Sequence, residues 1–222
     1  MISRELIFKA LGDRGLFIKF GDSIDRKIKK KIEELEIAIS TRGIDGIIET
    51  IPGYCSLLVL YDPLQSSFES LRDKIKDLNY GLDTFGSKET RTIDIPVIYG
   101  GEFGPDLKFV ADYHHVSEEE IIRIHTSTFY TVYLLGTTGF AFLGDLIEEI
   151  HTPRLETPRA LVPAGSVGIG NSQTGIFAVD GPSGWRIIGR TSVPIYNPGK
   201  EMPVFLRPGD NIRFVRVINT GG

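Results

Sequence analysis

The sequence is poor in the residues that build disulfide frameworks, zinc sites and membrane spans. It has one cysteine, Cys55, so neither an internal disulfide nor a zinc site built on several cysteines can form. No apolar run reaches the ~20 residues that a membrane-spanning helix requires, and the segment MISRELIFKA has no hydrophobic region of a signal peptide. We therefore expect a soluble, cytoplasmic protein that does not bind a membrane.

An excess of positive charge is also absent. The chain has 25 Lys and Arg against 29 Asp and Glu, a net charge of −4, whereas binding to nucleic acid phosphates requires basic clusters. The run RKIKKKIEELE is the one exception, but on a helix it places Lys29 near Glu33 and Lys30 near Glu34 at a stabilising spacing of four residues. This pattern indicates a solvated helix face, and we expect no nucleic-acid partner.

Familiar nucleotide, nucleophile and metal motifs are missing as well. There is no Walker A sequence and no G-x-S-x-G elbow, and the glycines at 168 and 170 lack the third glycine of a dinucleotide loop because Gln173 stands in its place. The adjacent His114 and His115 would point to opposite faces of a regular strand. No other metal-ligand spacing occurs, so we expect no metal site.

Residues 1–88 are expected to form a small α+β sandwich. Apolar runs with strand and helix periods alternate in the order ββαββα, with turns at Gly12–Gly15 and Pro52–Gly53. Gly43 is expected to end the first helix. In this order both helices cover one face of an antiparallel sheet.

Capping residues predict where these two helices begin. Asp22 or Ser23 can cap the first helix, and Ser66 and Glu69 have the spacing of a capping box for the second. The apolar stripe of the first helix consists of Ile24, Ile28, Ile32, Leu35 and Ile39. The polar segment LDTFGSKET then predicts a domain boundary near residue 88.

Residues 89–222 have the sequence pattern of a β-barrel or sandwich. RTIDIPVIY predicts a strand, and a capping box of Ser117 and Glu120 begins a helix. Short β-rich runs then alternate with Gly and Pro turns, apart from a short helical turn at LGDLIEEI. We expect further turns at Asp106 and Asp210.

The segment TPRLETPRALVPAGSVGIGNSQTGIF carries several candidate binding residues. Its three prolines resist placement in a central strand and indicate an edge or an extended loop. Gly165 and Ser166 follow in a predicted turn, where bare backbone amides can hold an anion. Arg154 and Arg159 are suited to a carboxylate or phosphate. Their odd spacing lets them share a ligand only if the chain bends; otherwise they are surface arginines on a rigid barrel rim.

His125 and Trp185 are further candidate functional residues. His125 follows Ile121 by one helical turn, so it is expected near the edge of the core, where its ordinary pKa would let it act as an acid or base. The alternative is a half-buried histidine with satisfied hydrogen bonds. Trp185 is the only tryptophan; it either packs in the core or lines a pocket.

Six ordered motifs resemble one known family. They are YGGEFGPDL, the histidine in IIRIHTSTFYTVYLLG, GFAFLG, TPRLETPRALVPAGSVGIGNSQTGIF, GPSGWRIIGRT and RPGDNIRF. They are similar to the family of the kinase A inhibitor of sporulating bacilli, whose members are also known as allophanate hydrolase subunit 1 or as the B subunit of bacterial ATP-dependent 5-oxoprolinase. The resemblance implies an N-terminal α+β domain over residues 1–88, a cyclophilin-like β-barrel over residues 89–222, and a relation to the carboxyltransferase portion of urea carboxylase.

The resemblance also implies partners and chemistry. The chain would act with a homologous C-type subunit and an A-type subunit to open 5-oxoproline to glutamate, with ATP as the co-substrate, and would be inactive alone. His125, which could move a proton, and Arg159 are the expected catalytic residues. The expected substrate-binding residues are Arg154, Gly165, Ser166, Gln173, Trp185 and Arg190.

Two loops depart from the family pattern, and other functions stay open. Gly136–Phe140 is one residue shorter than the family's Gly-Phe-x-Pro-Gly-Phe loop, and Pro182–Trp185 has a serine in place of one glycine. The main alternative function is a regulatory protein that binds the dimerisation domain of a sensor histidine kinase. A biotin-dependent carboxyltransferase module is less favoured, because no biotin-carrier segment is present. Apolar surface around Phe140 and Phe142 predicts an interface, and self-association when the partner is missing.

Overall fold

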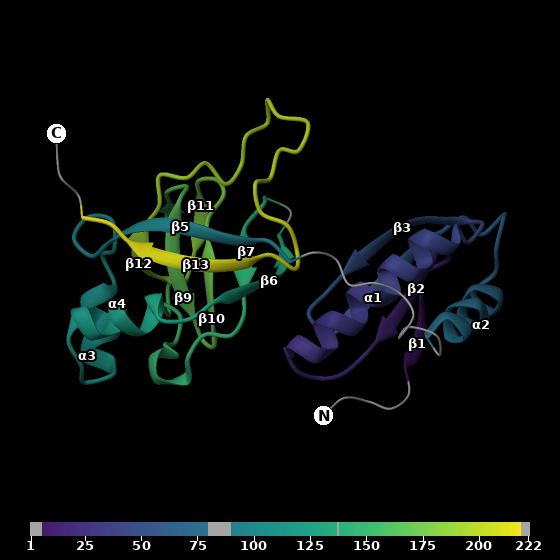
Figure 1. The fold of residues 1–222 in the computed structure, drawn as a ribbon, viewed down its shortest axis with the longest axis horizontal. Helices are drawn as coiled ribbons and strands as arrows, with labels where there is room; N and C mark the ends of the chain where they lie inside the picture. Colours follow the sequence, from purple (N-terminus) through teal and green to yellow (C-terminus); the bar gives the residue numbers. More distant parts are fainter. Residues whose placement is uncertain (1–5, 80–89, 137, 219–222) are drawn as a thin grey trace. The chain divides into compact units, whose positions relative to one another are not determined.

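The computed structural model describes residues 6–79, 90–136 and 138–218. The chain divides into two compact units, Met1–Glu89 and Thr90–Gly222, each with its own hydrophobic core (Figure 1). The predicted domain boundary near residue 88 lies outside the described residues. In the described part of the chain, no helix is both long enough and apolar enough to cross a membrane.

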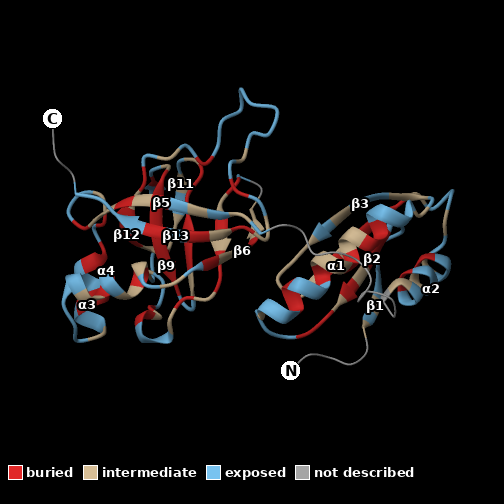
Figure 2. Cartoon of the chain, viewed as in Figure 1, coloured by how far each residue is buried: buried red, intermediate tan, exposed pale blue. Residues whose placement is uncertain are grey.

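The first unit is a four-stranded antiparallel sheet with two helices. Its elements are β1 (Ile7–Leu11), β2 (Gly15–Lys19), α1 (Arg26–Arg42), β3 (Ile47–Pro52), β4 (Ser56–Tyr61) and α2 (Phe68–Asn79). The strands lie in the order β1-β2-β4-β3. Alternate residues of β4, namely Leu57, Val59 and Tyr61, are buried in one core with Ile28, Ile32, Leu35 and Ile39 of α1. Figure 2 shows buried and exposed stretches along α1. The predicted order ββαββα is therefore confirmed.

Both helices of this unit begin one or more residues later than predicted. The cap of α1 is Asp25, whose side chain accepts a hydrogen bond from the Lys27 backbone nitrogen at 2.7 Å. Asp22 does not cap the helix, because it forms an ion pair with Lys19, and Ile24 is left outside the helix and exposed. Gly43 ends α1 as predicted, in the left-handed conformation at φ 58°.

The cap of α2 is also shifted by one residue. The Ser67 hydroxyl accepts a hydrogen bond from the Ser70 backbone nitrogen at 3.2 Å. The Ser66 hydroxyl instead donates to the carbonyl of Asp45 at 2.9 Å. The predicted capping box of Ser66 and Glu69 is therefore wrong by one position, because a long-range hydrogen bond occupies Ser66.

The second unit is built on a closed barrel. In the described residues the barrel order is β10-β7-β6-β13-β5-β12-β9. The barrel strands are β5 (Thr92–Tyr99), β6 (Tyr130–Leu135), β7 (Ala141–Leu143), β9 (Ser166–Gly170), β10 (Gln173–Ile176), β12 (Arg186–Arg190) and β13 (Asn211–Arg216). β13 pairs with β5 in parallel, and the other neighbouring strands pair antiparallel. The predicted α+β fold class is confirmed.

Two α-helices lie next to each other at one end of the barrel: α3 (Leu107–Tyr113) and α4 (Glu118–Thr126) (Figure 1). The capping box of α4 is present as predicted, since the Ser117 side chain accepts from the Glu120 backbone nitrogen at 3.1 Å. α3 was not predicted, and only a turn was expected at Asp106. The predicted helical turn at LGDLIEEI contains the 3-10 helix η2 (Glu148–Ile150).

A small two-stranded sheet lies outside the barrel. It pairs β8 (Arg159–Val162) with β11 (Gly181–Ser183). Pro158 and Pro163 flank β8, which pairs only with β11, so the expectation that these prolines avoid a central strand is confirmed. The later part of the same segment, however, forms the barrel strands β9 and β10. At the other predicted turn, the Asp210 carboxylate accepts from the Arg207 backbone nitrogen at 2.7 Å, just before β13.

Candidate functional site

An aromatic pocket of about 400 Å³ opens on the barrel unit next to the β8–β11 sheet. Its walls are four rings, Phe140, Phe142, Phe177 and Trp185; the Phe140 and Trp185 rings meet edge to face at 5.1 Å between centroids. The remaining lining residues are Thr138, Arg154, Ala178, Val179, Asp180, Gly181, Pro182 and Ser183. The rings come from segments around β7, β10 and β12, so closure of the barrel brings them together.

The aromatic pocket has one cationic and one anionic side chain. The Arg154 guanidinium lies over the Trp185 ring, 5.3 Å from its centroid, an arrangement that the negative face of the indole stabilises. Among the described residues Arg154 forms no ion pair with a carboxylate. Oδ1 of the Asp180 carboxylate accepts a hydrogen bond from the Ala164 backbone nitrogen at 2.7 Å. The pocket can therefore offer opposite charges to one ligand.

A second cavity of about 440 Å³, here called the Arg190 pocket, adjoins the first and shares Ala178 with it. Its lining consists of Ile98, Phe103, Ala164, Gly165, Ala178, Arg190, Thr191, Ser192, Val193, Pro194, Ile195 and Tyr196. Arg190 Nε donates to the Ala164 carbonyl at 3.0 Å. Since the Ala164 N–H donates to Asp180, this one residue is hydrogen-bonded to a charged side chain of each pocket.

The predicted turn at Gly165 and Ser166 is present, but its amides are already used. Gly165 N donates to the Phe177 carbonyl at 2.7 Å, and Ser166 N donates to the Pro163 carbonyl at 3.2 Å. The expectation of bare amide donors at this turn is therefore wrong. Gly165 still lines the Arg190 pocket, whereas Ser166 is buried at the start of β9.

Replacing Gly165 by alanine is expected to destabilise the barrel unit. Gly165 has φ 81°, and a Cβ atom there would lie 2.3 Å from the Thr191 carbonyl oxygen, so strain and a backbone clash should together lower the free energy of unfolding by about 2–4 kcal/mol. Gly181→Ala is the matched control, because a Cβ atom there meets nothing within 4 Å. Urea unfolding of both variants would measure the difference, and equal midpoints would contradict the prediction.

His125 is completely buried, so the expectation that it lies near the edge of the core is wrong. Its Nε2 lies 2.9 Å from the Thr174 hydroxyl, and its Nδ1 lies 2.8 Å from the Tyr99 hydroxyl. Thr174 donates its single proton to the Gly168 carbonyl at 3.0 Å. Nε2 must therefore carry the proton, and Nδ1 accepts from Tyr99.

This network holds His125 in its neutral form. Burial lowers the pKa of His125 to about 3, because an imidazolium in the core would lose its hydration. Burial also raises the pKa of Tyr99 well above its ordinary value, so the hydroxyl stays a donor. His125 lines neither pocket; its hydrogen bonds instead connect α4 to β5 and β10 inside the barrel.

Arg159 pairs with a buried carboxylate. Its two terminal nitrogens donate to both oxygens of Asp106, at 2.8 and 2.7 Å, and this pairing raises the pKa of Arg159. Asp106, which is 5% exposed, also accepts from the Ile187 backbone nitrogen at 2.7 Å. The pair therefore ties the β8–β11 sheet to the start of α3 and to β12. The two residues are 53 positions apart in the sequence, so no local pattern predicts this contact.

The predicted site residues thus separate into groups. Arg154 and Trp185 line the aromatic pocket, and Gly165 and Arg190 line the neighbouring one. The lining of neither pocket includes His125, Arg159, Ser166 or Gln173. Gln173 begins β10 and pairs with Gly170 of β9. Within the described ranges, no group of three His, Cys, Asp or Glu side chains could hold a metal ion.

The rings around Phe140 were expected to form an exposed interface, and the structure gives them a different environment. Phe140 and Phe142 are half-buried and pack against Phe177 and Trp185 in a small hydrophobic cluster. They are therefore pocket walls. In the sequence, the signal for this pocket is the aromatic residues within GFAFLG and GPSGW. Which of these rings meet depends on the order of the barrel strands.

The fold and the pockets together define an α+β protein whose closed barrel carries an aromatic pocket lined by one cationic and one anionic side chain. The chain belongs to the family described as carboxyltransferase domain, subdomain C and D, whose model matches residues 6–206. The resemblance found in the sequence motifs is therefore confirmed.

Named relatives and a solved structure agree with this family. The chain is 38% identical to the B subunit of 5-oxoprolinase from Bacillus subtilis (strain 168), over 93% of this chain and 91% of that protein. It is 43% identical to the B subunit of 5-oxoprolinase from Escherichia coli O157:H7, over 92% and 93% of the two chains. The crystal structure of TTHA0988 matches with a TM-score of 0.80 and 33% identity; the match covers 92% of this chain but only 40% of that longer chain.

Proposed function

We propose that this chain is a subunit of a 5-oxoprolinase-type complex and that its aromatic pocket binds the small-molecule substrate. The observation that carries the substrate assignment is the placement of Arg154 and Asp180 in the lining of one cavity whose walls are aromatic. The names of the two relatives, each the B subunit of 5-oxoprolinase, support the assignment of the chain to such a complex.

The chemistry of the pocket matches a cyclic amide that carries a carboxylate. The Arg154 guanidinium can pair with the carboxylate of 5-oxoproline. Asp180 uses Oδ1 to accept from Ala164, which leaves Oδ2 to accept from the lactam N–H. The flat ring would pack against the faces and edges of Phe140, Phe177 and Trp185. The pocket would thus hold the substrate by its two polar ends and orient the ring.

In this proposal the reaction is completed by other subunits. ATP is the co-substrate of the complex, and its terminal phosphoryl group is transferred to the amide oxygen. Water then attacks the activated ring carbon, the C–N bond breaks, and the nitrogen takes up a proton, which leaves an acyl phosphate. A second water hydrolyses this acyl phosphate to glutamate and free phosphate. The chain lacks a Walker motif, so we assign the main nucleotide contacts to a partner. We further propose a homologous C-type subunit and an A-type subunit as the partners.

Replacement of Arg154 tests the substrate pocket. In a reconstituted complex, Arg154→Gln is expected to lower kcat/KM for ATP-dependent glutamate release by about 10- to 100-fold, mainly through KM, because it removes a charge-assisted hydrogen bond to the carboxylate. Arg154→Lys should recover part of the loss because it restores the charge. Arg123→Gln is the matched control, since Arg123 is an exposed arginine of α4 outside both pockets.

A direct binding measurement separates the pocket from the reaction. The only tryptophan, Trp185, lines the aromatic pocket, so 5-oxoproline should change its fluorescence in the isolated chain, and Arg154→Gln should weaken the effect. If an intact three-subunit complex released no glutamate from 5-oxoproline, the assigned reaction would be wrong. If release were unaffected by Arg154→Gln, the aromatic pocket would not be the substrate site.

A further inference from the structure

The Arg190 pocket has a feature that the proposed reaction does not use: a half-buried guanidinium in a cavity without acidic side chains. None of its lining residues is Asp or Glu. Among the described residues, the Arg190 side chain has no ion pair with a carboxylate, and its one hydrogen bond runs from Nε to the Ala164 carbonyl at 3.0 Å. A cation partly removed from water without a counter-charge favours binding of an anion.

The hydrogen bond to Ala164 also determines how an anion can be held. Because Nε is occupied, the two terminal nitrogens form the remaining face of the guanidinium, and this pair matches the two oxygens of a carboxylate. Ser192, which is exposed and lines the same cavity, can add one hydroxyl donor. One cation neutralises a singly charged carboxylate, whereas a phosphate dianion would keep a net negative charge.

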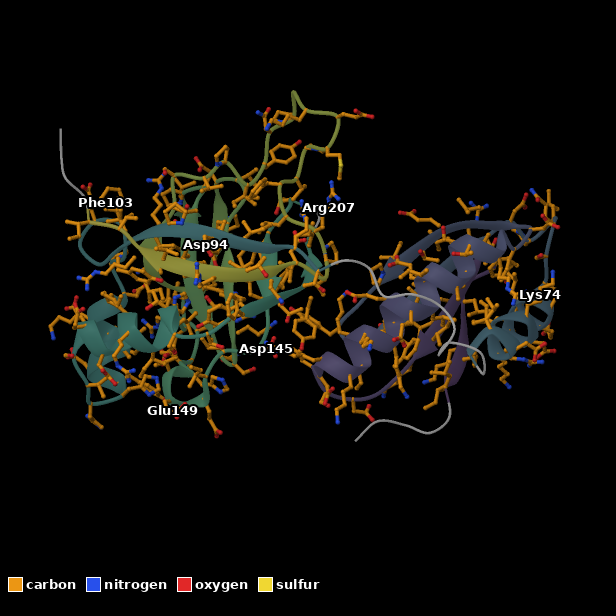
Figure 3. All side chains as sticks on the ribbon, viewed as in Figure 1. Lys74, Asp94, Phe103, Asp145, Glu149 and Arg207 are labelled. Carbon is orange, nitrogen blue, oxygen red and sulfur yellow. The ribbon has the colours of Figure 1, made fainter. Side chains whose placement is uncertain are left out.

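The rest of the Arg190 pocket is mainly apolar. Phe103, which follows β5 and is labelled in Figure 3, lines it together with Val193, Pro194, Ile195 and Tyr196. The cavity volume of about 440 Å³ lies in the range of small-molecule sites. An apolar body would remove this surface from water. These walls therefore favour a carboxylate that carries a hydrocarbon group over a small hydrophilic anion.

We propose that the Arg190 pocket is a second ligand site, which binds a small carboxylate with an apolar body. It is separate from the aromatic pocket because Trp185 and Arg154 line only the first cavity, and Arg190 lines only the second. The two cavities share Ala178 and are bridged by the hydrogen bonds of Ala164. The assignment does not depend on the reaction proposed above, since binding can be measured in the chain without partners or ATP.

The test uses 4-methylpentanoate as ligand, with 4-methylpentanamide and inorganic phosphate as comparisons, and follows backbone amide shifts of the full chain by NMR. Saturable shifts should appear at Thr191 and Ser192, with a dissociation constant on the order of 1 mM. Arg190→Gln should weaken binding by about tenfold or more because the charge-assisted pair is lost. Arg154→Gln should leave the affinity within about twofold, since that arginine lines the other pocket.

A second variant keeps the proposal testable if Arg190→Gln does not fold. Ser192→Asp leaves Arg190 and its bond to Ala164 in place but adds a negative charge to the lining, so it should also weaken binding by about tenfold. Three results would overturn the proposal: no saturable shifts in the unmodified chain, loss of binding in Arg154→Gln alone, or binding of the amide or of phosphate as tight as that of the carboxylate. None of them would bear on glutamate release by the complex.

Discussion

Acidification from pH 6.5 to 4.5 is expected to lower the free energy of unfolding of the barrel unit by roughly 2–3 kcal/mol through His125 alone. The pKa of His125 is lowered to about 3 in the folded chain, whereas an unfolded chain has an ordinary histidine pKa of about 6.5. Below pH 6.5 the unfolded state therefore binds a proton that the folded state does not, at about 1.4 kcal/mol per pH unit. The full loss, roughly 5 kcal/mol, is reached near pH 3.

The measurement is urea unfolding followed by fluorescence of Trp185, which is the only tryptophan and lies in the barrel unit. The window above about pH 4.5 is chosen because most carboxylates titrate below it. Burial also lowers the pKa of His114, so titration of His114 also makes the free energy of unfolding fall as the pH falls. The difference between variants is therefore more informative than the profile of one protein.

His125→Gln is the control variant, because its amide can donate to Thr174 and accept from Tyr99 but cannot titrate. It should be less stable at pH 7 by about 1–3 kcal/mol, since the imidazole stacks on Phe214 with 4.6 Å between centroids. Between pH 6.5 and 4.5 its free energy of unfolding should fall less steeply than that of the unmodified chain. The two slopes should differ by about 1.4 kcal/mol per pH unit. Parallel profiles for the two proteins would show that His125 is not the group that titrates.

Local sequence signals predicted most elements of the fold. The errors occurred where contacts between residues far apart in the sequence determine the local structure. The turn at Gly12–Gly15, the stop at Gly43 and the cap at Ser117 depend on neighbouring residues, and all three are present. The start of α2 shifted because Ser66 bonds to Asp45, 21 positions away. Helix α3 was missed because it has only seven residues, too few to be stable without packing partners.

The candidate site was predicted less well because residue type does not reveal which side chains meet. The prolines correctly indicated the edge strand β8, and Trp185 and Arg154 do line one pocket. The depth of His125 could not be predicted from its helix, because it is set by Tyr99 and Phe214 on other elements. Similarly, Arg159 has the residue type of an anion clamp, but a carboxylate far away in the sequence already occupies it.

Removal of the Asp106 carboxylate is also expected to lower the free energy of unfolding strongly. Asp106→Ala should lower the free energy of unfolding by about 3 kcal/mol, because it leaves the Arg159 guanidinium partly buried without its partner and removes the acceptor of the Ile187 N–H. Asp94→Ala is the matched control. Asp94, which is labelled in Figure 3, forms a similar two-bond pair with Arg213 in which both side chains are about half exposed, so its loss should cost at most about 1 kcal/mol.

Asp106→Ala, together with Arg159→Ala, also tests whether the ion pair of Asp106 and Arg159 supports the aromatic pocket. Arg159 begins β8, which pairs with β11, and the three residues of β11 line that pocket. Asp106→Ala and Arg159→Ala should therefore both weaken the fluorescence response of Trp185 to 5-oxoproline, although neither residue lines the pocket. In a double-mutant cycle the combined loss of stability should be smaller than the sum of the single losses by about 1–3 kcal/mol. Additive losses, or an unchanged ligand response in both folded variants, would show that the pair neither couples these elements nor holds the pocket wall in place.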